Sequence, residues 1–288
     1  MLDPADLSES ERTAVEAELR TLADDQFVVA ERYIDWQVRG PTLEADIAVA
    51  NIAQDEYGHA RLWYDLLERL GYDEAELIWE RSPDEFRHAT LLELGYEPGD
   101  WADAVLRGYL YDTFERLHLE ALEGTSYPPI ADRLEKVQGE EAYHREHTQS
   151  WLDRLTEGSE VSPAPRESGE AAGRSSDDPV RRLQAALDRL YPHALTLFEP
   201  TDAEPAILET GVRTRSIDAL REDWLAVTTP FLEGLGLTVP EPSLPDVRGR
   251  DGSHTDDWTS LYDEFTYSYE MLGREPAKLM DAPDEVEG

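Results

Sequence analysis

Apolar residues recur every three or four positions along most of the chain, which is the spacing of one buried face on an α-helix. In the first half this pattern fills four long stretches, at residues 8–38, 39–72, 100–124 and 128–158. We find no stretch with the alternation of apolar and polar residues expected of a half-buried strand. The pattern predicts an all-α fold that begins with an antiparallel four-helix bundle.

Local signals mark the ends of these helices. Ser8 is suited to cap the first helix, because Glu11 follows three residues later and can complete a capping box. We expect Pro41 in the first turn of the second helix, which ends at Gly71. The third helix ends at Gly124.

The second half predicts additional helices that pack on the bundle. Residues 159–178 are rich in Ser, Pro, Gly and acids, which is typical of a flexible linker. This linker divides the chain into a bundle at 1–158 and C-terminal helices at 179–288. Helical patterns follow at residues 179–200, where Pro192 should introduce a kink, 215–236 and 255–273.

The chain is strongly acidic, with a formal net charge of -38 over 288 residues. That charge repels nucleic acid and anionic membrane surfaces, so we expect neither as a partner. Only two of the 26 basic residues are lysines, Lys136 and Lys278. We interpret an acid-rich, lysine-poor surface as halophilic, since high salt screens its self-repulsion; the alternative is an ordinary acidic protein.

Other chemistry is excluded by what the sequence lacks. Without cysteine the chain has no disulfide, thiolate metal site or iron–sulfur cluster. No run of about 18 apolar residues could span a membrane, and we find no signal peptide. We therefore expect a cytoplasmic protein.

A Glu-x-x-His spacing is the main chemical signal in the sequence. In a chain with this many acids about one such pair is expected by chance, so the position of each pair on its helix must decide. The spacing occurs at Glu56 and His59, Glu85 and His88, Glu115 and His118, and Glu141 and His144.

Two of the pairs lie on apolar faces. Glu56 and His59 share a stripe of the second helix with apolar residues, and Glu141 and His144 take two positions in the apolar seam of the fourth. A buried carboxylate without a partner costs several kcal/mol. A pair of divalent metal ions would remove that cost, and carboxylate and imidazole are suitable ligands for iron or manganese.

A dimetal carboxylate bundle also needs one acid from each of the other two helices. On the first helix, Glu31 falls on a line with Phe27 and Ile34, although it could instead be an exposed acid. On the third helix, periodicity does not separate Asp112 from Glu115.

The two remaining pairs are assigned no metal. We expect Glu115 and His118 to form a surface pair along their helix. Glu85 and His88 lie in a short polar segment after Pro83, and we interpret their spacing as chance.

Several segments together resemble a known family, the diiron subunits of the phenylacetyl-CoA 1,2-epoxidase complex (ring-1,2-epoxidase, or phenylacetate-CoA oxygenase). The similarity runs from about residue 20 to about residue 272. It is carried by "ADIAVANIAQDEYGHARLWYDLL", "YLYDTFERL", "EEAYHREHTQSWLDRL", "DRLYPHALTLFEP" and "GLTVPEPSL". The family contains two homologous types, of which the A-type is catalytic and the C-type is mainly structural. The length, "RSPDEFRHATLLEL" and "GSHTDDWTSLYDEF" look more like the C-type.

The resemblance implies a ferritin-like bundle and a complete ligand set, as in the A-type, although C-type members have lost several ligands. It also selects Asp112 over Glu115. Two iron ions are implied, with manganese possible. The residues at the ligand positions are Glu31, Glu56, His59, Asp112, Glu141 and His144.

The resemblance further implies a function. The chain would belong to a multicomponent diiron monooxygenase that epoxidises the ring of phenylacetyl-CoA in aerobic phenylacetate catabolism. Its partners would be a reductase that supplies the electrons, a small accessory subunit, and a homologous ferritin-like subunit. One alternative is a non-catalytic subunit that scaffolds a separate catalytic one. Another is a stand-alone ferroxidase or manganese catalase. The sequence selects no residues for binding coenzyme A.

Overall fold

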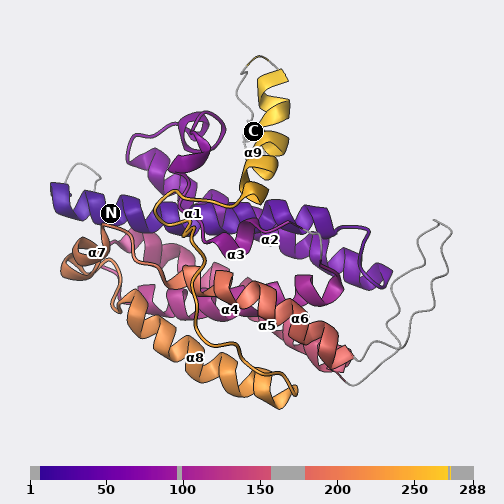
Figure 1. Cartoon of the computed structure of the whole chain (residues 1–288). Helices are drawn as coiled ribbons and strands as arrows, with labels where there is room; N and C mark the ends of the chain where they lie inside the picture. The colour runs from indigo at the N-terminus through magenta and orange to yellow at the C-terminus, as the bar shows by residue number, and fades with distance from the viewer. Residues whose placement is uncertain (1–6, 96–98, 157–178, 272, 274–288) are drawn as a thin grey trace, which may run out of the picture.

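Two long helical hairpins form the centre of the protein. The structure is a computed structural model that describes residues 7–95, 99–156, 179–271 and 273, and no strand occurs in those ranges. The predicted all-α fold is therefore confirmed. The long helices are α1 (Glu9–Trp36), α2 (Leu43–Arg69), α4 (Trp101–Leu122) and α5 (Pro128–Thr156). Helix α1 packs along α2, α4 packs along α5, and α2 also contacts α5 (Figure 1).

The helix ends follow local chemistry. Ser8 caps α1 in a capping box with Glu11, as predicted. The prediction for Pro41 is wrong, because Thr42 caps α2 and leaves the proline outside the helix. Gly71 follows α2 with φ +103°, a left-handed conformation that glycine adopts without strain.

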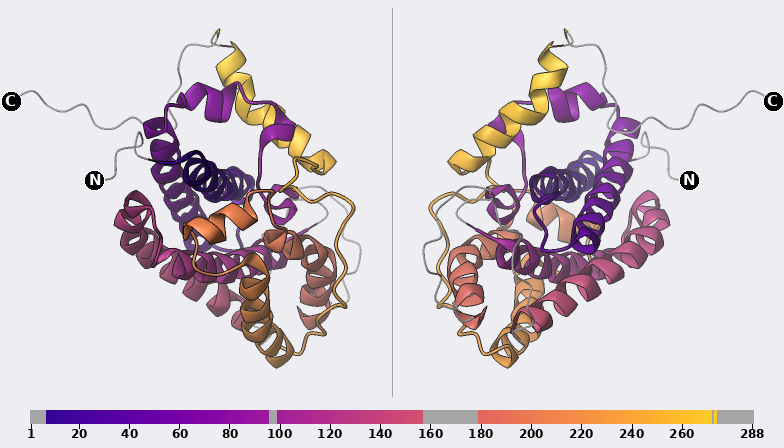
Figure 2. Two further views of the ribbon diagram at one scale, coloured as in Figure 1. Left: turned by 90° about the vertical axis from the view of Figure 1, so that its left-hand side faces the viewer. Right: turned by 90° about the vertical axis from the view of Figure 1, so that its right-hand side faces the viewer.

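The C-terminal helices lie against the bundle. Helices α6 and α8 contact α4, whereas α7 and α9 contact α1 (Figures 1 and 2). Pro192 lies in the last turn of α6, and a 3₁₀ turn follows at Leu195–Phe198. The bounds are α6 (Pro179–Ala194), α7 (Glu204–Thr210), α8 (Ile217–Gly234) and α9 (Asp256–Met271). The predicted linker at 159–178 lies outside the described residues.

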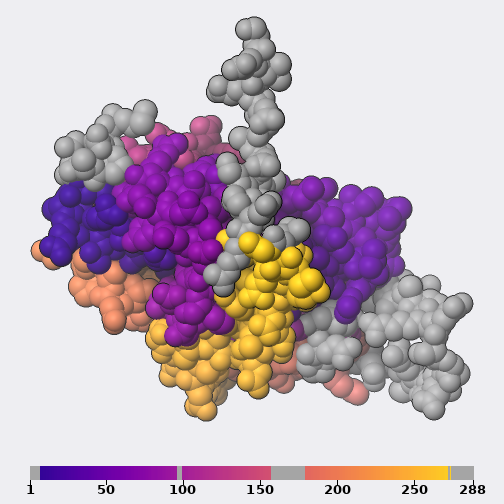
Figure 3. All heavy atoms as spheres, turned by 90° about the horizontal axis from the view of Figure 1, so that it is seen from above, coloured from indigo at the N-terminus to yellow at the C-terminus, as the bar shows by residue number. Residues whose placement is uncertain are grey.

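Short helical turns connect the two hairpins. A π-helical turn (Ala75–Trp79), a 3₁₀ turn (Pro83–Glu85) and α3 (Thr90–Glu93) occupy the segment between α2 and α4. Helix α9 and the segment before it lie on the same face as this connection (Figure 3). None of the helices in the described part of the chain is long and apolar enough to cross a membrane.

Helix α4 is the central helix of the protein. It is buried on nearly every side because α5 covers one face and α6 and α8 cover others. Gly108 allows the closest approach: a Cβ atom there would lie 2.8 Å from Thr148 Cγ2 and 3.0 Å from Tyr33 Oη. Helices α1 and α5 therefore approach α4 so closely at Gly108 that a larger residue would not fit there.

We predict that Gly108→Ala lowers the free energy of unfolding by about 1–2 kcal/mol, because overpacking outweighs the gain in helix propensity. The matched control is Gly139→Ala on exposed α5 surface, where a Cβ atom meets nothing within 4 Å. The free energy of unfolding of that variant should rise by about 0.5–1 kcal/mol. Urea unfolding followed by circular dichroism measures both, and equal stabilisation by the two variants would contradict the packing argument.

Candidate metal centre

Helices α2 and α5 turn their Glu-x-x-His pairs toward each other inside the bundle. Glu56, His59 and His144 are fully buried, and Glu141 is 1% exposed. Each pair continues an apolar stripe of its helix, because residues three and four apart share one face. The four side chains are therefore buried together, on the apolar faces that the sequence predicted for them.

Both imidazoles direct Nδ1 into this group. The Nδ1 atoms of His59 and His144 each lie 3.2 Å from Glu141 Oε1, and His144 Nδ1 lies 3.6 Å from Glu56 Oε1. The two rings are 6.2 Å apart between centroids. One carboxylate oxygen thus lies between two imidazole nitrogens from different helices.

A second layer of carboxylates fixes the orientation of the rings. His59 Nε2 lies 2.7 Å from Glu140 Oε2, and His144 Nε2 lies 3.2 Å from Asp55 Oδ2. Carboxylate oxygens accept hydrogen bonds, so each Nε2 is placed to donate outward, and Nδ1 is the nitrogen of each ring that would face a metal. Metal-binding histidines are commonly oriented in this way.

Helix α4 contributes two acids rather than one. Asp112 and Glu115 are both buried, and Asp112 Oδ2 accepts a hydrogen bond from Thr148. The predicted surface pair is wrong: Glu115 joins the centre, while buried His118 contacts Glu18 instead. Periodicity could not show this, because α4 is covered on nearly all sides.

Helix α1 faces the centre with Gln26 and Tyr33, two residues that the sequence did not indicate. Gln26 contacts Glu115, and the charges of Asp112 and Glu56 act on Tyr33. Glu31 is not brought into the group. It accepts a hydrogen bond from Tyr57 and faces Glu264 of α9, and burial raises the pKa of Glu31 to about 7.

Glu31 lies away from the centre because of the helical repeat of α1. Five residues along an α-helix rotate Glu31 by about 140° from Gln26, whereas seven residues bring Tyr33 back to nearly the same face. Helix α1 is buried on most sides in this region, so an apolar line through Phe27 and Glu31 did not identify the face that meets the centre.

The group is rich in buried polar atoms without hydrogen-bond partners. Eight such atoms belong to six residues, and they are both carboxylate oxygens of Glu56 and of Glu141, Asp112 Oδ1, Glu115 Oε2, and Nδ1 of His59 and of His144. Ligand atoms from Glu56, His59, Glu115 and Glu141 lie within 4.8 Å of one another. Buried polar atoms without hydrogen bonds are destabilising, and this set of oxygen and nitrogen donors fits two divalent metal ions.

Electrostatics lead to the same conclusion. Burial raises the pKa of Glu56 to about 7, with the charge of Glu141 adding to the effect. Burial and Glu141 also raise the pKa values of Asp112 and Glu115. Burial opposes ionisation of Glu141 itself, but His144 and His59 hold its pKa at about 2. Without cations these four acids cannot all be charged; two divalent ions would allow it.

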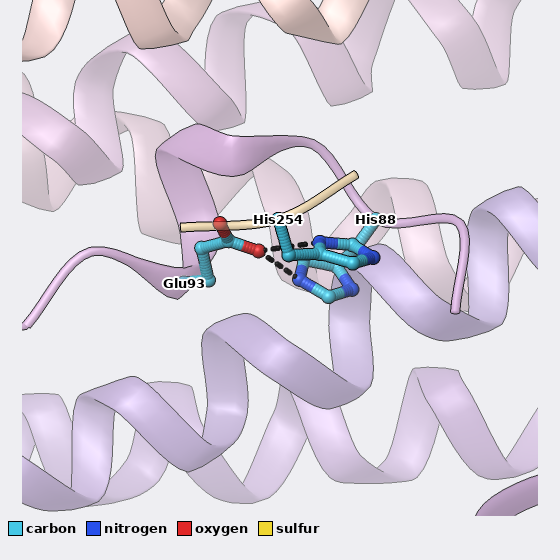
Figure 4. A group of neighbouring side chains, drawn as sticks. All are labelled: His88, Glu93 and His254. Carbon is cyan, nitrogen blue, oxygen red and sulfur yellow. Dashed lines mark hydrogen bonds and ion pairs between the residues drawn. The ribbon is translucent and has the colours of Figure 1, made fainter. Parts of the chain in front are cut away.

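His88, Glu93 and His254 form a second group, in which His88 and Glu93 are buried and His254 is partly buried (Figure 4). His88 Nε2 and His254 Nδ1 lie 2.6 and 2.7 Å from the same oxygen, Glu93 Oε2, and the two rings stack. The other oxygen accepts the Thr255 N–H, and His254 Nε2 faces the Phe86 carbonyl oxygen. His88 thus pairs with Glu93, and not with Glu85, which lies three residues before it.

This second group is a hydrogen-bonded clamp. Among the ring and carboxylate atoms of His88, Glu93 and His254, only His88 Nδ1 lacks a hydrogen-bond partner. Burial opposes ionisation of Glu93, yet hydrogen bonds from His254 and His88 hold its pKa at about 2. The clamp joins α3 to the segment that leads into α9.

Four helices that surround an inward-facing set of carboxylates and two Glu-x-x-His pairs define the class of ferritin-like carboxylate bundles. Within that class, the chain belongs to the family described as "Phenylacetic acid catabolic protein", whose sequence model matches residues 1–168 and 170–274. The family resemblance predicted from the sequence is confirmed.

Two curated proteins of Escherichia coli (strain K12) are similar to this chain, and both are subunits of 1,2-phenylacetyl-CoA epoxidase. The chain is 26% identical over 253 residues to the C subunit of that epoxidase, and the match covers 87% of this chain and 94% of the relative. It is 28% identical over 214 residues to the A subunit, and that match covers 73% of this chain and 63% of the relative.

We predict that Glu93→Gln lowers the free energy of unfolding at pH 7 by about 2–4 kcal/mol, because the clamp loses its buried charge. The folded-state pKa of Glu93 is depressed to about 2, so its contribution is present above about pH 5 and is lost as the pH falls toward 2. The difference between variant and wild type should therefore shrink as the pH is lowered from about 5 to about 3.

Denaturant unfolding at several pH values measures this difference. Glu135→Gln, on the exposed surface of α5, is the control and should change stability by less than about 0.5 kcal/mol. A Glu93→Gln effect that stays constant with pH would contradict the role of the carboxylate charge.

Proposed function

We propose that this chain is a diiron subunit of a multicomponent oxygenase that epoxidises the aromatic ring of phenylacetyl-CoA. The proposal rests on one observation above all: six buried residues, on three helices, direct unpartnered oxygen and nitrogen atoms at one another in a chain of this family. Both similar proteins are named as subunits of an epoxidase for that compound. They do not favour a stand-alone ferroxidase or catalase.

The ligands would be the carboxylates of Glu56, Asp112, Glu115 and Glu141 with Nδ1 of His59 and His144. Glu31, selected from the sequence, would not be among them. Bound ferrous ions would supply the reducing chemistry that activates dioxygen. Overall, one oxygen atom would enter the ring and the other would leave as water, with two protons and with two electrons from a separate reductase.

The chain's own residues would prepare and protect the centre. Glu140 and Asp55 hold a proton on Nε2 of each imidazole, so both rings remain oriented as neutral ligands. Gly108 lets Tyr33 and Thr148 come close together beside Asp112, and this packing would keep water from that end of the site. The partners would be the reductase, a small accessory subunit, and a homologous ferritin-like subunit.

A second candidate is a non-catalytic subunit that scaffolds a catalytic one. It is favoured by the amide of Gln26, because a bundle of this class takes a carboxylate from the corresponding helix. In this role the bound metal would be structural. The two candidates differ in whether the metal of this chain is needed for turnover.

We predict that the wild-type chain, reconstituted with ferrous iron under anaerobic conditions, binds about two irons, and that Glu141→Ala binds iron at least about 10–100-fold more weakly. Glu141 contacts both imidazoles, so its loss should affect both metal positions. Elemental analysis and Mössbauer spectra measure the result. Glu146→Ala, exposed on the same helix, is the control and should bind like wild type.

We further predict the outcome of turnover in the complex reassembled from this chain, its three partners and phenylacetyl-CoA. A complex that contains Glu141→Ala should lose at least about 100-fold in dioxygen-dependent product formation if this chain is catalytic. Full activity of a complex with an iron-free Glu141→Ala chain would instead establish the scaffold role.

A further inference from the structure

Helix α1 presents an amide to the metal centre where this class of bundle presents an acid. Gln26 and Tyr33 lie seven residues apart on one face of α1. Gln26 contacts Glu115, and Tyr33 Oη and Asp112 Oδ2 both lie beside Gly108, so this face meets the centre. A dimetal carboxylate bundle draws a single acid from each of the two helices that lack a Glu-x-x-His pair. Neither of these α1 residues is an acid.

The orientation of the Gln26 amide is determined by its neighbours. The indole Nε1–H of Trp63 donates to Gln26 Oε1 at 2.6 Å, and an indole nitrogen can only donate. The amide nitrogen must therefore face the other way, where it donates to Glu115 Oε1. A glutamine in this orientation holds a carboxylate, whereas a glutamate at position 26 would repel it.

Glu115 has one oxygen available for a metal. Oε1 is bound by Gln26, but Oε2 is buried and has no partner. A ligand atom of Glu115 lies within 4.8 Å of ligand atoms from Glu56, His59 and Glu141. Glu115 also lies one turn after Asp112 on α4, so both acids reach the centre from the same helix.

We infer that Glu115, held in place by Gln26, is the fourth carboxylate of the metal centre and replaces the acid that α1 does not supply. This inference rests on the proposed metal centre and specifies its composition. Four carboxylates balance the charge of two ferrous ions, whereas Glu56, Asp112 and Glu141 alone would leave a net positive charge in a dry core. Gln26 is the positioning residue, and it does not contact metal.

The test exchanges the amide and the acid. Iron per chain is measured by elemental analysis, at matched free ferrous iron, in wild type, Glu115→Gln, Gln26→Glu and the double variant Gln26→Glu/Glu115→Gln. We expect about two irons in wild type, about one in Glu115→Gln, and about two again in the double variant, where α1 supplies the acid. Mössbauer spectra should show coupled iron pairs in wild type and the double variant only.

Two comparisons separate folding from ligation. Both exchanges are nearly isosteric, and circular dichroism with urea unfolding of the metal-free proteins checks the fold. Glu120→Gln, exposed on the same helix and paired with Arg116, is the matched control and should retain the wild-type iron content.

This inference would be overturned if Glu115→Gln bound as much iron as wild type while Glu141→Ala lost iron. That result would leave the proposed function intact. If the double variant bound no more iron than Glu115→Gln, the claim that Glu115 replaces an acid of α1 would be wrong. No iron in the wild type after reconstitution would overturn the proposed function itself.

Discussion

Acids in the core of the bundle can keep their charge only when a cation or hydrogen-bond donors lie beside them, and the rest of the structure depends on how that constraint is met. Three buried acids of α1 are each paired with an arginine from a distant segment. The pairs are Glu18 with Arg213, Asp24 with Arg81, and Asp25 with Arg250, at 2.8, 2.6 and 2.7 Å. These pairs hold α1 against segments near residues 81, 213 and 250.

The acids of the candidate metal centre meet the same constraint differently. Throughout the described ranges, no lysine or arginine comes within ion-pair distance of Glu56, Asp112, Glu115 or Glu141. Their polar neighbours are imidazoles, a hydroxyl and the amide of Gln26. The chain supplies arginine to other buried acids close by, so a metal ion is the cation that suits this position.

Part of the site could be predicted from the sequence because α2 and α5 are each covered mainly on one side. Their apolar stripes identify the inward face, and Glu56, His59, Glu141 and His144 lie on it. On α4 and α1 the same reasoning failed. Residues 22–30 of α1 are all buried, and almost every residue of α4 is buried too, so no polar stripe shows which face meets the centre.

The sequence by itself determined the helical class and the two Glu-x-x-His pairs, because these depend on spacing within one helix. It determined the family through the resemblance of several segments along the chain. Tertiary structure alone decided that Glu115 and Gln26 face the centre while Glu31 faces Tyr57 and α9. It also joined Glu93 to His254, which is 161 residues away in the sequence. The physical reason is that helical periodicity fixes relative positions around one axis, whereas the rotation of each helix against its neighbours is set by the packing of the whole bundle.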